Sequence, residues 1–239
     1  MSGNAALTLE RRDPRTLVTL EAVVFDFDGL ILDTEWPIYE ATAAAFATFG
    51  IEVPVPDWAT VVGLADVDHD WFGLLAQRLC FTLSQAEFEA AYQAQDRSRR
   101  DLLEPLVGVV ELLDALTTAS VPVGIASSSD LAWIEKHLAR VGLRDGFEVI
   151  VGVDHDAVGG VGKPDPAVYR IACRELGADP ARTVALEDSA HGVAAAKAAG
   201  LRVVAVPNRI TRHSALDHAD LVARSLAEVT VEDLAALVS

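Results

Sequence analysis

Residues 22–29 read Ala22-Val23-Val24-Phe25-Asp26-Phe27-Asp28-Gly29, a β-branched and aromatic run that ends in two carboxylates and a glycine. A short apolar run that stops at a turn signal predicts a buried strand. Runs of the same kind recur at 121–126, 147–151, 183–186 and 201–206, and a shorter one lies at 220–222. The chain therefore predicts a set of buried strands of which residues 22–27 form the first.

Helical patterns lie between these predicted strands. Apolar residues recur at helical spacing in 109–116 and 131–141, and two further helices are predicted at 166–176 and 189–199, each ended by a glycine. Strand and helix thus alternate at the length of βαβ units. This alternation predicts an α/β fold with a doubly wound parallel sheet, covered by helices on both faces. We expect residues 21–33 and 105–239 to form this core domain.

Residues 34–104 break the alternation, because they contain no convincing strand. Helices are predicted at 38–49, at 66–79, and from the capping box Ser84-Gln85-Ala86-Glu87 to about residue 100. The stretch predicts a smaller all-α cap domain inserted after the first strand, with hinges near Pro37 and Pro105. Ligands of doubly wound sheets bind at the carboxyl ends of the strands, so this insert would cover the ligand like a lid.

Composition narrows the class of protein. Of 239 residues, 51% are hydrophobic and 23% charged, which indicates a packed globular chain. The formal net charge of −17 disfavours nucleic acid and anionic membranes as partners. No apolar run reaches the roughly 18 residues of a membrane span, and residues 1–20 form a polar leader without a secretory apolar core. We expect a cytoplasmic protein in which Cys80 and Cys173 are reduced thiols.

Four polar features follow the predicted strands or precede a helix. Each is common on its own, as a turn, a helix cap or a loop. Together, at successive strand ends, they would share one edge of the sheet, where paired carboxylates need a cation and hydroxyls at a helix start suit an anion. The four are the pair Asp26 and Asp28, the run Ser127-Ser128-Ser129, Lys163 before Pro164, and the pair Glu187 and Asp188.

This set resembles the haloacid dehalogenase superfamily, in the subgroup whose helical cap follows the first strand. The resemblance covers about residues 22–222. Residues 26–35 match the first motif of that family closely, and residues 126–128 are similar to the second. Residues 163–166 resemble the third motif, although Ala167 stands where the family usually has aspartate and the loop 152–163 is longer than usual. The fourth is matched by 187–189 with Gly192 and 199–200.

The resemblance implies a catalytic set and a magnesium ion. It makes Asp26 the nucleophile that forms an aspartyl-phosphate. It makes Asp28 the general acid and then the general base. Mg²⁺ would be held by the Asp26 carboxylate, the Asp28 backbone carbonyl and Asp188, with Glu187 close by or ligating. Lys163 would place positive charge beside Asp26 and the transferring phosphoryl group.

The resemblance also implies a phosphate-binding set. Ser127 and the backbone N–H groups of Phe27, Asp28 and Ser128 would bind the phosphoryl oxygens, and Gly29 belongs to the same loop. The substrate implied is a small-molecule phosphate ester.

We expect a magnesium-dependent phosphatase acting on a small phosphorylated metabolite, such as a sugar phosphate. Members of the family that release halide lack an aspartate at the position of Asp28. Those that cleave carbon–phosphorus bonds need a cap lysine, and residues 34–104 contain none. A β-phosphoglucomutase-like mutase is the main alternative. Such mutases use a cap-loop arginine and a Lys-Asn pair, where this chain has no arginine in 62–69 and reads Ser-Asp-Leu at 129–131.

A non-enzymatic phospho-acceptor domain is a weaker alternative, because such domains lack both the second aspartate and a helical cap. Substrate identity and oligomeric state stay open. The acidic cluster at 66–70 is interpreted as the start of a helix, and the alternatives are a second metal site or a loop that faces the substrate. The acidic cluster at 154–156 is interpreted as a surface loop. Asp33 and Glu35 could contact substrate hydroxyls or cap the next helix.

Overall fold

The computed structural model describes residues 19–62, 70–95 and 102–239, and six strands in these residues form one parallel sheet. The strand order β3-β2-β1-β4-β5-β6 places β1 between β2 and β4, with Val23 opposite both Val123 and Val184. This order confirms the predicted α/β fold with a doubly wound sheet. The strands are β1 (Ala22–Phe25), β2 (Val123–Ala126), β3 (Val149–Val151), β4 (Thr183–Glu187), β5 (Arg202–Ala205) and β6 (Leu221–Val222).

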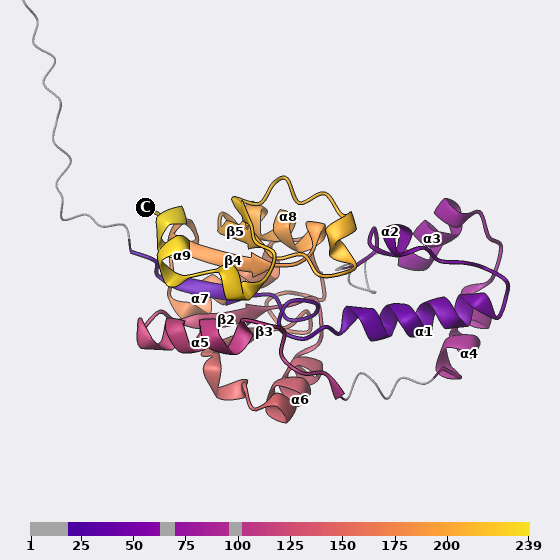
Figure 1. The fold of residues 1–239 in the computed structure, drawn as a ribbon, viewed down its shortest axis with the longest axis horizontal. Helices are drawn as coiled ribbons and strands as arrows, with labels where there is room; N and C mark the ends of the chain where they lie inside the picture. Colours follow the sequence, from indigo (N-terminus) through magenta and orange to yellow (C-terminus); the bar gives the residue numbers. More distant parts are fainter. Residues whose placement is uncertain (1–18, 63–69, 96–101) are drawn as a thin grey trace, which may run out of the picture.

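Helices cover both faces of the sheet (Figure 1). Side chains alternate along a strand, so Val23 and Phe25 enter one apolar cluster while Val24 enters another. The first cluster is closed by α5 (Val109–Thr118), α6 (Leu131–Val141) and α9 (Val231–Leu237). The second is closed by α7 (Ala167–Leu176) and α8 (Ala190–Ala199). Short 3-10 helices lie at Arg144–Gly146, Pro180–Arg182, Thr211–His213 and Leu226–Glu228.

Local sequence signals account for where several helices begin and end. The predicted capping box is present, because Ser84 Oγ accepts from Glu87 N while Glu87 Oε2 accepts from Ser84 N. Gly177 and Gly200 end α7 and α8 with positive φ, as expected of glycine at these positions. A second capping box, formed by Thr230 and Asp233, opens α9, which the sequence patterns did not predict.

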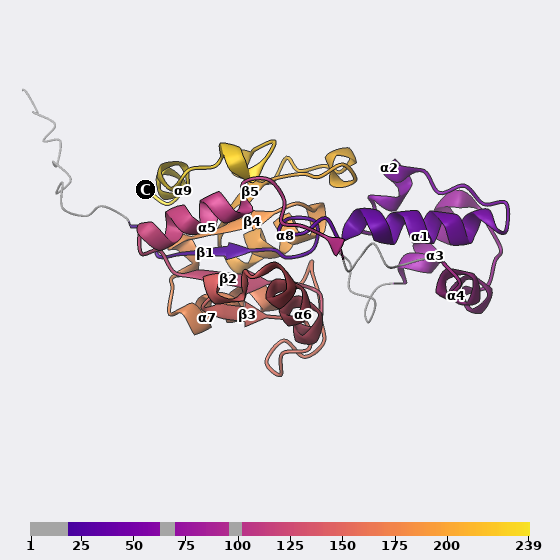
Figure 2. The same cartoon turned by 60° about the horizontal axis from the view of Figure 1, so that its bottom comes forward.

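In the described residues between β1 and α5, four helices build a separate apolar cluster and are called the helical part. They are α1 (Glu35–Ala47), α2 (Val55–Trp58), α3 (Trp71–Leu79) and α4 (Gln85–Gln93). Phe46 stacks on Phe88 with ring centroids 4.5 Å apart. Figure 2 shows the helical part lying beyond the end of the sheet to which β1 points. The division of the chain into domains at 34 and 104 stays a prediction.

Two of the predicted helix boundaries need correction. Helix α4 ends at Gln93, earlier than the predicted position near residue 100, although residues 96–101 lie outside the described part of the chain. Helix α3 begins at Trp71, because Asp70 accepts a hydrogen bond from Gly73 N at 2.7 Å and so caps it. The first part of the predicted helix, 66–69, lies outside the described residues. Helix α2 was not predicted.

The chain enters and leaves the helical part at one place. Leu32 pairs with Pro105, and Leu106 N donates to Ile31 O at 2.9 Å. Beyond this junction, Ile210 of the core packs into the apolar cluster of the helical part, and His191 Nε2 lies 3.3 Å from Thr60 O.

Among the described residues, none of the helices combines the length and the apolar character required to cross a bilayer. The predicted polar leader falls almost entirely in residues 1–18, which are not described. Cys80 and Cys173 are free thiols, as expected, and Cys80 is exposed.

Candidate active site

Three buried carboxylates meet where β1 and β4 end. Asp26 directly follows β1, and its N–H donates to Leu186 O of β4 at 2.9 Å. Glu187 is the last residue of β4, and Asp188 comes next. One oxygen from each of Asp26, Glu187 and Asp188 lies within 4.8 Å of the others, and all three side chains are buried. Neighbouring parallel strands thus bring the first and fourth predicted motifs together.

Lys163 supplies the positive charge at this cluster. Its side chain is 2% exposed, and Nζ lies 2.5 Å from Asp26 Oδ1 and 2.6 Å from Glu187 Oε1. Burial alone would lower the pKa of Lys163, but the two adjacent carboxylates outweigh burial and raise it, so the ammonium stays charged. Burial also raises the pKa of Asp26 to about 7, although Lys163 acts in the opposite direction. One ammonium group therefore faces three carboxylates.

Glu187 is clamped from several sides. Its Oε1 accepts from Lys163 Nζ and from the Tyr169 hydroxyl, each at 2.6 Å. Its Oε2 accepts from the backbone N–H groups of Asp188 and Ser189 at 3.1 and 3.3 Å. Gly192 makes room for the carboxylate, because a Cβ there would lie 1.9 to 2.0 Å from its atoms. Sequence reasoning missed Tyr169, which looks like any other core residue on the buried face of α7.

Asp188 is oriented by a side chain that the sequence interpretation also missed. Asn208 Nδ2 donates to Asp188 Oδ2 at 2.8 Å and to Gly29 O at 3.2 Å. The Asn208 oxygen accepts from the backbone N–H groups of Ile210 and Thr211, which fixes which end of the amide faces Asp188. Asn208 comes shortly after β5, so a search for polar residues behind every strand would have found it.

Asp28 lies on the side of the site where β2 ends. Its Oδ2 accepts from Ser129 Oγ at 2.6 Å and lies 3.5 Å from Ser127 Oγ. Its Oδ1 accepts from Trp133 Nε1 at 3.0 Å. Lys163 N donates to Ser128 Oγ at 3.0 Å, which joins the second and third predicted motifs. The structure thus brings all four motifs to one edge of the sheet.

The residues predicted to bind phosphate line the same edge. Ser127 is buried and lies beside Asp28. Gly29 adopts φ +83°, its N–H donates to Leu32 O at 2.8 Å, and a Cβ there would lie 2.5 Å from Asp188 Oδ2. The Phe27 ring is buried in the core. Phosphate contacts by Ser127, Ser128, Phe27 and Gly29 stay predictions.

Asp33 and Glu35 lie where the chain enters α1. Asp33 Oδ1 accepts from Trp36 N at 3.3 Å, and its Oδ2 lies 2.8 Å from Arg209 Nη2, whose guanidinium stacks on the Trp36 ring. Asp33 thus accepts from one N–H group in the first turn of α1, whose N-cap residue is Thr34. Burial raises the pKa of Asp188 well above its usual range, and the negative charges of Asp26, Glu187 and Glu35 act in the same direction.

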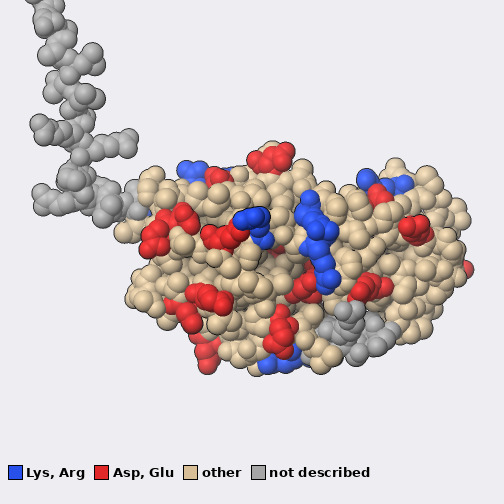
Figure 3. Space-filling model, in the orientation of Figure 1, with Lys and Arg blue, Asp and Glu red and all other residues tan. Residues whose placement is uncertain are grey.

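The other acidic clusters have structural partners in the part of the chain that is described. Asp154 Oδ1 accepts from Leu131 N at 2.8 Å at the start of α6, and His155 Nε2 lies 3.1 Å from Glu175 Oε1. In the cluster at 66–70, Asp70 caps α3 and the remaining members are not described. On the face shown in Figure 3, acidic side chains are scattered over both parts of the molecule.

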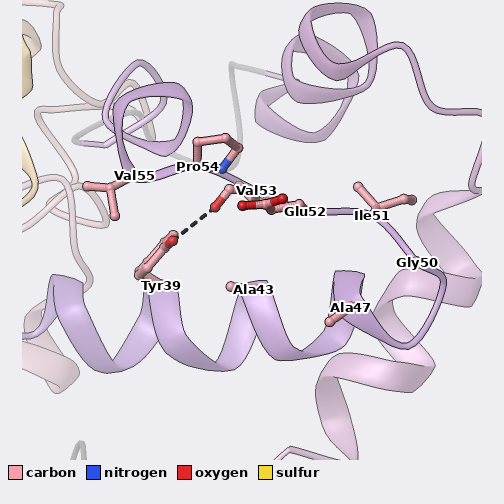
Figure 4. Close-up of a pocket in the computed structure, with 9 residues that line it drawn as sticks. All are labelled: Tyr39, Ala43, Ala47, Gly50, Ile51, Glu52, Val53, Pro54 and Val55. Carbon is pink, nitrogen blue, oxygen red and sulfur yellow. Dashed lines mark hydrogen bonds between the residues drawn. The ribbon is translucent and has the colours of Figure 1, made fainter.

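A pocket of about 480 Å³ lies in the helical part, between α1 and residues 50–55 (Figure 4). Its walls are mainly small and apolar, and the Tyr39 hydroxyl donates to Val53 O across it at 2.9 Å. Glu52 is its one ionisable carboxylate, and no residue of the acid cluster lines it. The pocket therefore lacks the groups that the acid cluster provides.

Several known proteins are similar to this chain in sequence and in fold. YhcW of Bacillus subtilis is 37% identical over 211 residues, which cover 88% of this chain and 94% of YhcW. Hexitol phosphatase B of Escherichia coli (strain K12) is 32% identical over 225 residues, covering 89% and 96%. The crystal structure of CbbY from Rhodobacter sphaeroides in complex with phosphate is 28% identical with a TM-score of 0.65, covering 87% and 96%.

A family model for haloacid dehalogenase-like hydrolases matches residues 23–206, from the first strand to the end of the fifth. The match includes Asp26, Lys163 and Asp188, which meet at the edge of the sheet, and it confirms the resemblance drawn from the four motifs. The chain belongs to the haloacid dehalogenase-like hydrolases.

Proposed function

We propose that this protein is a Mg²⁺-dependent phosphatase that hydrolyses a small phosphorylated metabolite through an aspartyl-phosphate on Asp26. The observation that carries the proposal is the placing of Asp26 Oδ1 2.5 Å from Lys163 Nζ, within a cluster that includes Asp188. The similarity to a hexitol phosphatase and to a protein crystallised with phosphate supports this reaction and favours a sugar or polyol phosphate as the substrate.

The donor set fits a magnesium ion. Mg²⁺ prefers oxygen ligands and binds through one or two carboxylates together with water and substrate oxygens. Buried carboxylates that outnumber the one ammonium beside them repel each other unless a cation is present. We assign the carboxylates of Asp26 and Asp188 and the backbone carbonyl of Asp28 to the ion. Glu187 completes the acid cluster, although its oxygens are already shared with Lys163 and Tyr169.

When bound, the ion offsets negative charge on the phosphoryl oxygens. Asp26 then attacks phosphorus, so an Asp26 oxygen–phosphorus bond forms while the bond from phosphorus to the ester oxygen breaks. Asp28 gives its proton to the departing alcohol. A water molecule attacks the phosphorus of the aspartyl-phosphate and loses its proton to Asp28, while the bond from phosphorus to the Asp26 oxygen breaks. Inorganic phosphate leaves, and both aspartates return to their starting state.

Lys163 and Ser127 support this reaction without forming bonds to phosphorus. The Lys163 ammonium neutralises part of the charge that builds up as two anions approach each other. The Ser127 hydroxyl, beside Asp28, donates to a phosphoryl oxygen. We propose that the helical part excludes bulk water while the ester is bound, since it lies beyond the end of the sheet where the acid cluster sits.

Hydrolysis is favoured over phosphoryl transfer to a second position of a sugar. The stretch Ser129-Asp130-Leu131 carries an acid where the similar mutases carry a basic residue, and Ser129 is bound to Asp28 at 2.6 Å. A second phosphate would meet this acid without a compensating charge. An assay with β-glucose 1-phosphate separates the reactions, because a phosphatase releases phosphate whereas a mutase yields glucose 6-phosphate.

The nucleophile is tested by Asp26→Asn with p-nitrophenyl phosphate and Mg²⁺. The amide keeps the shape of the side chain but cannot form the acyl phosphate, so turnover should fall by about 10³-fold or more. Asp114→Asn, an exposed position on α5, serves as the matched control and should retain activity. Undiminished turnover in Asp26→Asn would exclude the proposed intermediate, and one labelling event per wild-type chain without turnover would indicate a phospho-acceptor domain.

A further inference from the structure

The carboxylate of Asp28 is held on both of its oxygens by side chains that follow β2. Trp133 Nε1 donates to Oδ1 at 3.0 Å, and Ser129 Oγ contacts Oδ2 at 2.6 Å. Ser127 Oγ, on the phosphate-binding side of the proposed site, lies 3.5 Å from the same Oδ2. The two oxygens therefore have different surroundings, one with an indole and one with hydroxyls.

We propose that Trp133 is the positioning residue of Asp28, and that its indole N–H determines which carboxyl oxygen carries the transferred proton. The inference rests on the proposed function, because it assigns Asp28 the proton transfer. It adds a residue outside the four motifs, on helix α6, to the machinery of the reaction.

The chemistry of the indole gives the direction of the effect. An indole N–H only donates, so the oxygen that it contacts must present a lone pair. A proton on the Asp28 carboxyl group is then directed to Oδ2. The neighbours of Oδ2 are the hydroxyls of Ser127 and Ser129, and hydroxyls both donate and accept. The proton is thereby held on Oδ2, the oxygen on the side of Ser127 and of the proposed phosphate site.

The packing of α6 keeps the indole in place. The Trp133 ring lies on His137, one turn later, with ring centroids 4.0 Å apart. His137 is fully buried, its Nδ1 lies 2.9 Å from Trp133 O, and its ring meets the edge of Phe27 at 6.5 Å. Because Phe27 lies between the two aspartates in sequence, this set of ring contacts joins α6 to the catalytic loop. The Nε1–H is therefore presented to Asp28 by a fixed ring.

The test compares two aryl phosphates that differ in how much they need a general acid. p-Nitrophenolate leaves readily without a proton, whereas phenolate is about as basic as a tyrosine side chain, with a pKa of about 10, and needs one. Trp133→Phe removes the N–H and keeps an aromatic ring on His137. We expect kcat/KM for phenyl phosphate to fall roughly tenfold, and kcat/KM for p-nitrophenyl phosphate to stay within about twofold of wild type.

Two further variants serve as a control and as a second test. Trp58→Phe is the matched control, because the buried Trp58 Nε1 of the helical part has no hydrogen-bond partner among the described residues, and both esters should be hydrolysed as by wild type. Ser129→Ala removes the other side chain that holds Asp28 without touching the indole. It should show the same dependence on the leaving group to a smaller extent.

Each outcome has a distinct meaning. Equal losses on both esters, or no loss on either, in Trp133→Phe and Ser129→Ala would overturn the assignment of Trp133 while leaving the phosphatase reaction standing. A wild-type protein that releases no phosphate from either ester with Mg²⁺ would overturn the proposed function itself. Because kcat/KM reports the steps up to the release of the alcohol, a slower second step cannot imitate the expected pattern.

Discussion

Tyr169 contributes to the site through its hydroxyl group and its ring. Its hydroxyl donates to Glu187 Oε1 at 2.6 Å, and the Lys163 ammonium lies 4.9 Å from the centre of its ring. Burial raises the pKa of Tyr169 well above its usual range, and the nearby carboxylates act in the same direction, so the hydroxyl keeps its proton and remains a donor. Tyr169 therefore holds Glu187, and Glu187 in turn holds Lys163 against Asp26.

Removing this hydroxyl should weaken the protein and its activity together. In Tyr169→Phe a buried carboxylate loses a donor, which we expect to lower the free energy of unfolding by about 2 kcal/mol, as measured by urea titration. Turnover of p-nitrophenyl phosphate should fall several-fold, because Lys163 is held less firmly. Tyr39→Phe is the matched control. It loses a bond to the neutral carbonyl of Val53 and should cost about 1 kcal/mol without affecting turnover. Identical effects of the two changes would contradict this role.

At the scale of elements, the start of α8 is shaped around a side chain of the strand before it. Ser189 caps this helix by accepting from Gly192 N at 3.1 Å, and Gly192 then leaves space for the Glu187 carboxylate. Helix α8 is otherwise rich in alanine, which is the residue most favourable to helix formation. A glycine in its first turn thus serves the close approach of Glu187.

Gly192→Ala should therefore destabilise the protein, although alanine favours helix formation more than glycine does. Alanine would ordinarily stabilise a helix by up to about 1 kcal/mol relative to glycine. Here the new Cβ would lie 1.9 to 2.0 Å from Glu187, so the carboxylate must move and release Lys163. We expect a lower melting temperature and a loss of turnover of roughly tenfold or more. Ala194→Gly, on the exposed side of α8, should lower stability alone. An active, more stable Gly192→Ala protein would show that Glu187 is not confined there.

The elements that the sequence predicted are those with strong local patterns. The strands beginning at Ala22 and Thr183 are apolar runs closed by carboxylates, so both the strands and the side chains behind them could be placed. The predicted strands 121–126 and 201–206 are shorter in the structure, and the N–H groups of Val121 and Leu201 donate back to the preceding helices rather than to a neighbouring strand.

Two of the three residues that sequence reasoning missed reach the site only because their helices pack onto the sheet. Tyr169 and Trp133 lie on amphipathic helices, where an aromatic residue on the inner face predicts core packing as well as it predicts a site. Only the packing of α7 and α6 onto the sheet brings the Tyr169 hydroxyl to Glu187 and the Trp133 N–H to Asp28. Asn208 differs, because it follows a predicted strand and its place could have been inferred.

At the scale of the whole molecule, the acid cluster belongs to a chain whose formal net charge is −17. The long-range field of such a chain opposes the approach of a phosphate ester. Local charge must therefore reverse this repulsion at the site. Lys163 is the basic side chain bonded to the acid cluster in the described residues, whereas Lys197 is bound to Asp220 at the surface. A divalent cation would supply the missing charge.

This shortage of positive charge predicts how stability depends on pH and metal. Burial raises the pKa of Asp26 to about 7 and raises that of Asp188 as well, above the values near 4 expected in the unfolded chain. The folded protein then binds more protons than the unfolded chain between about pH 4 and pH 7. Stability contributed by these protons is present at the acidic end of this window and is lost as the pH rises through it.

A divalent cation binds the ionised carboxylates and should restore the stability that is lost as the pH rises. We therefore expect the melting temperature in EDTA to fall from pH 5 to pH 8, and Mg²⁺ to raise it at pH 8 by on the order of 10 °C but much less at pH 5. Sodium chloride of equal ionic strength should not reproduce the effect, and Asp188→Asn should reduce both the fall in EDTA and the gain with Mg²⁺. If Mg²⁺ leaves the melting temperature at pH 8 unchanged, the negative charge of the three carboxylates is compensated without a metal.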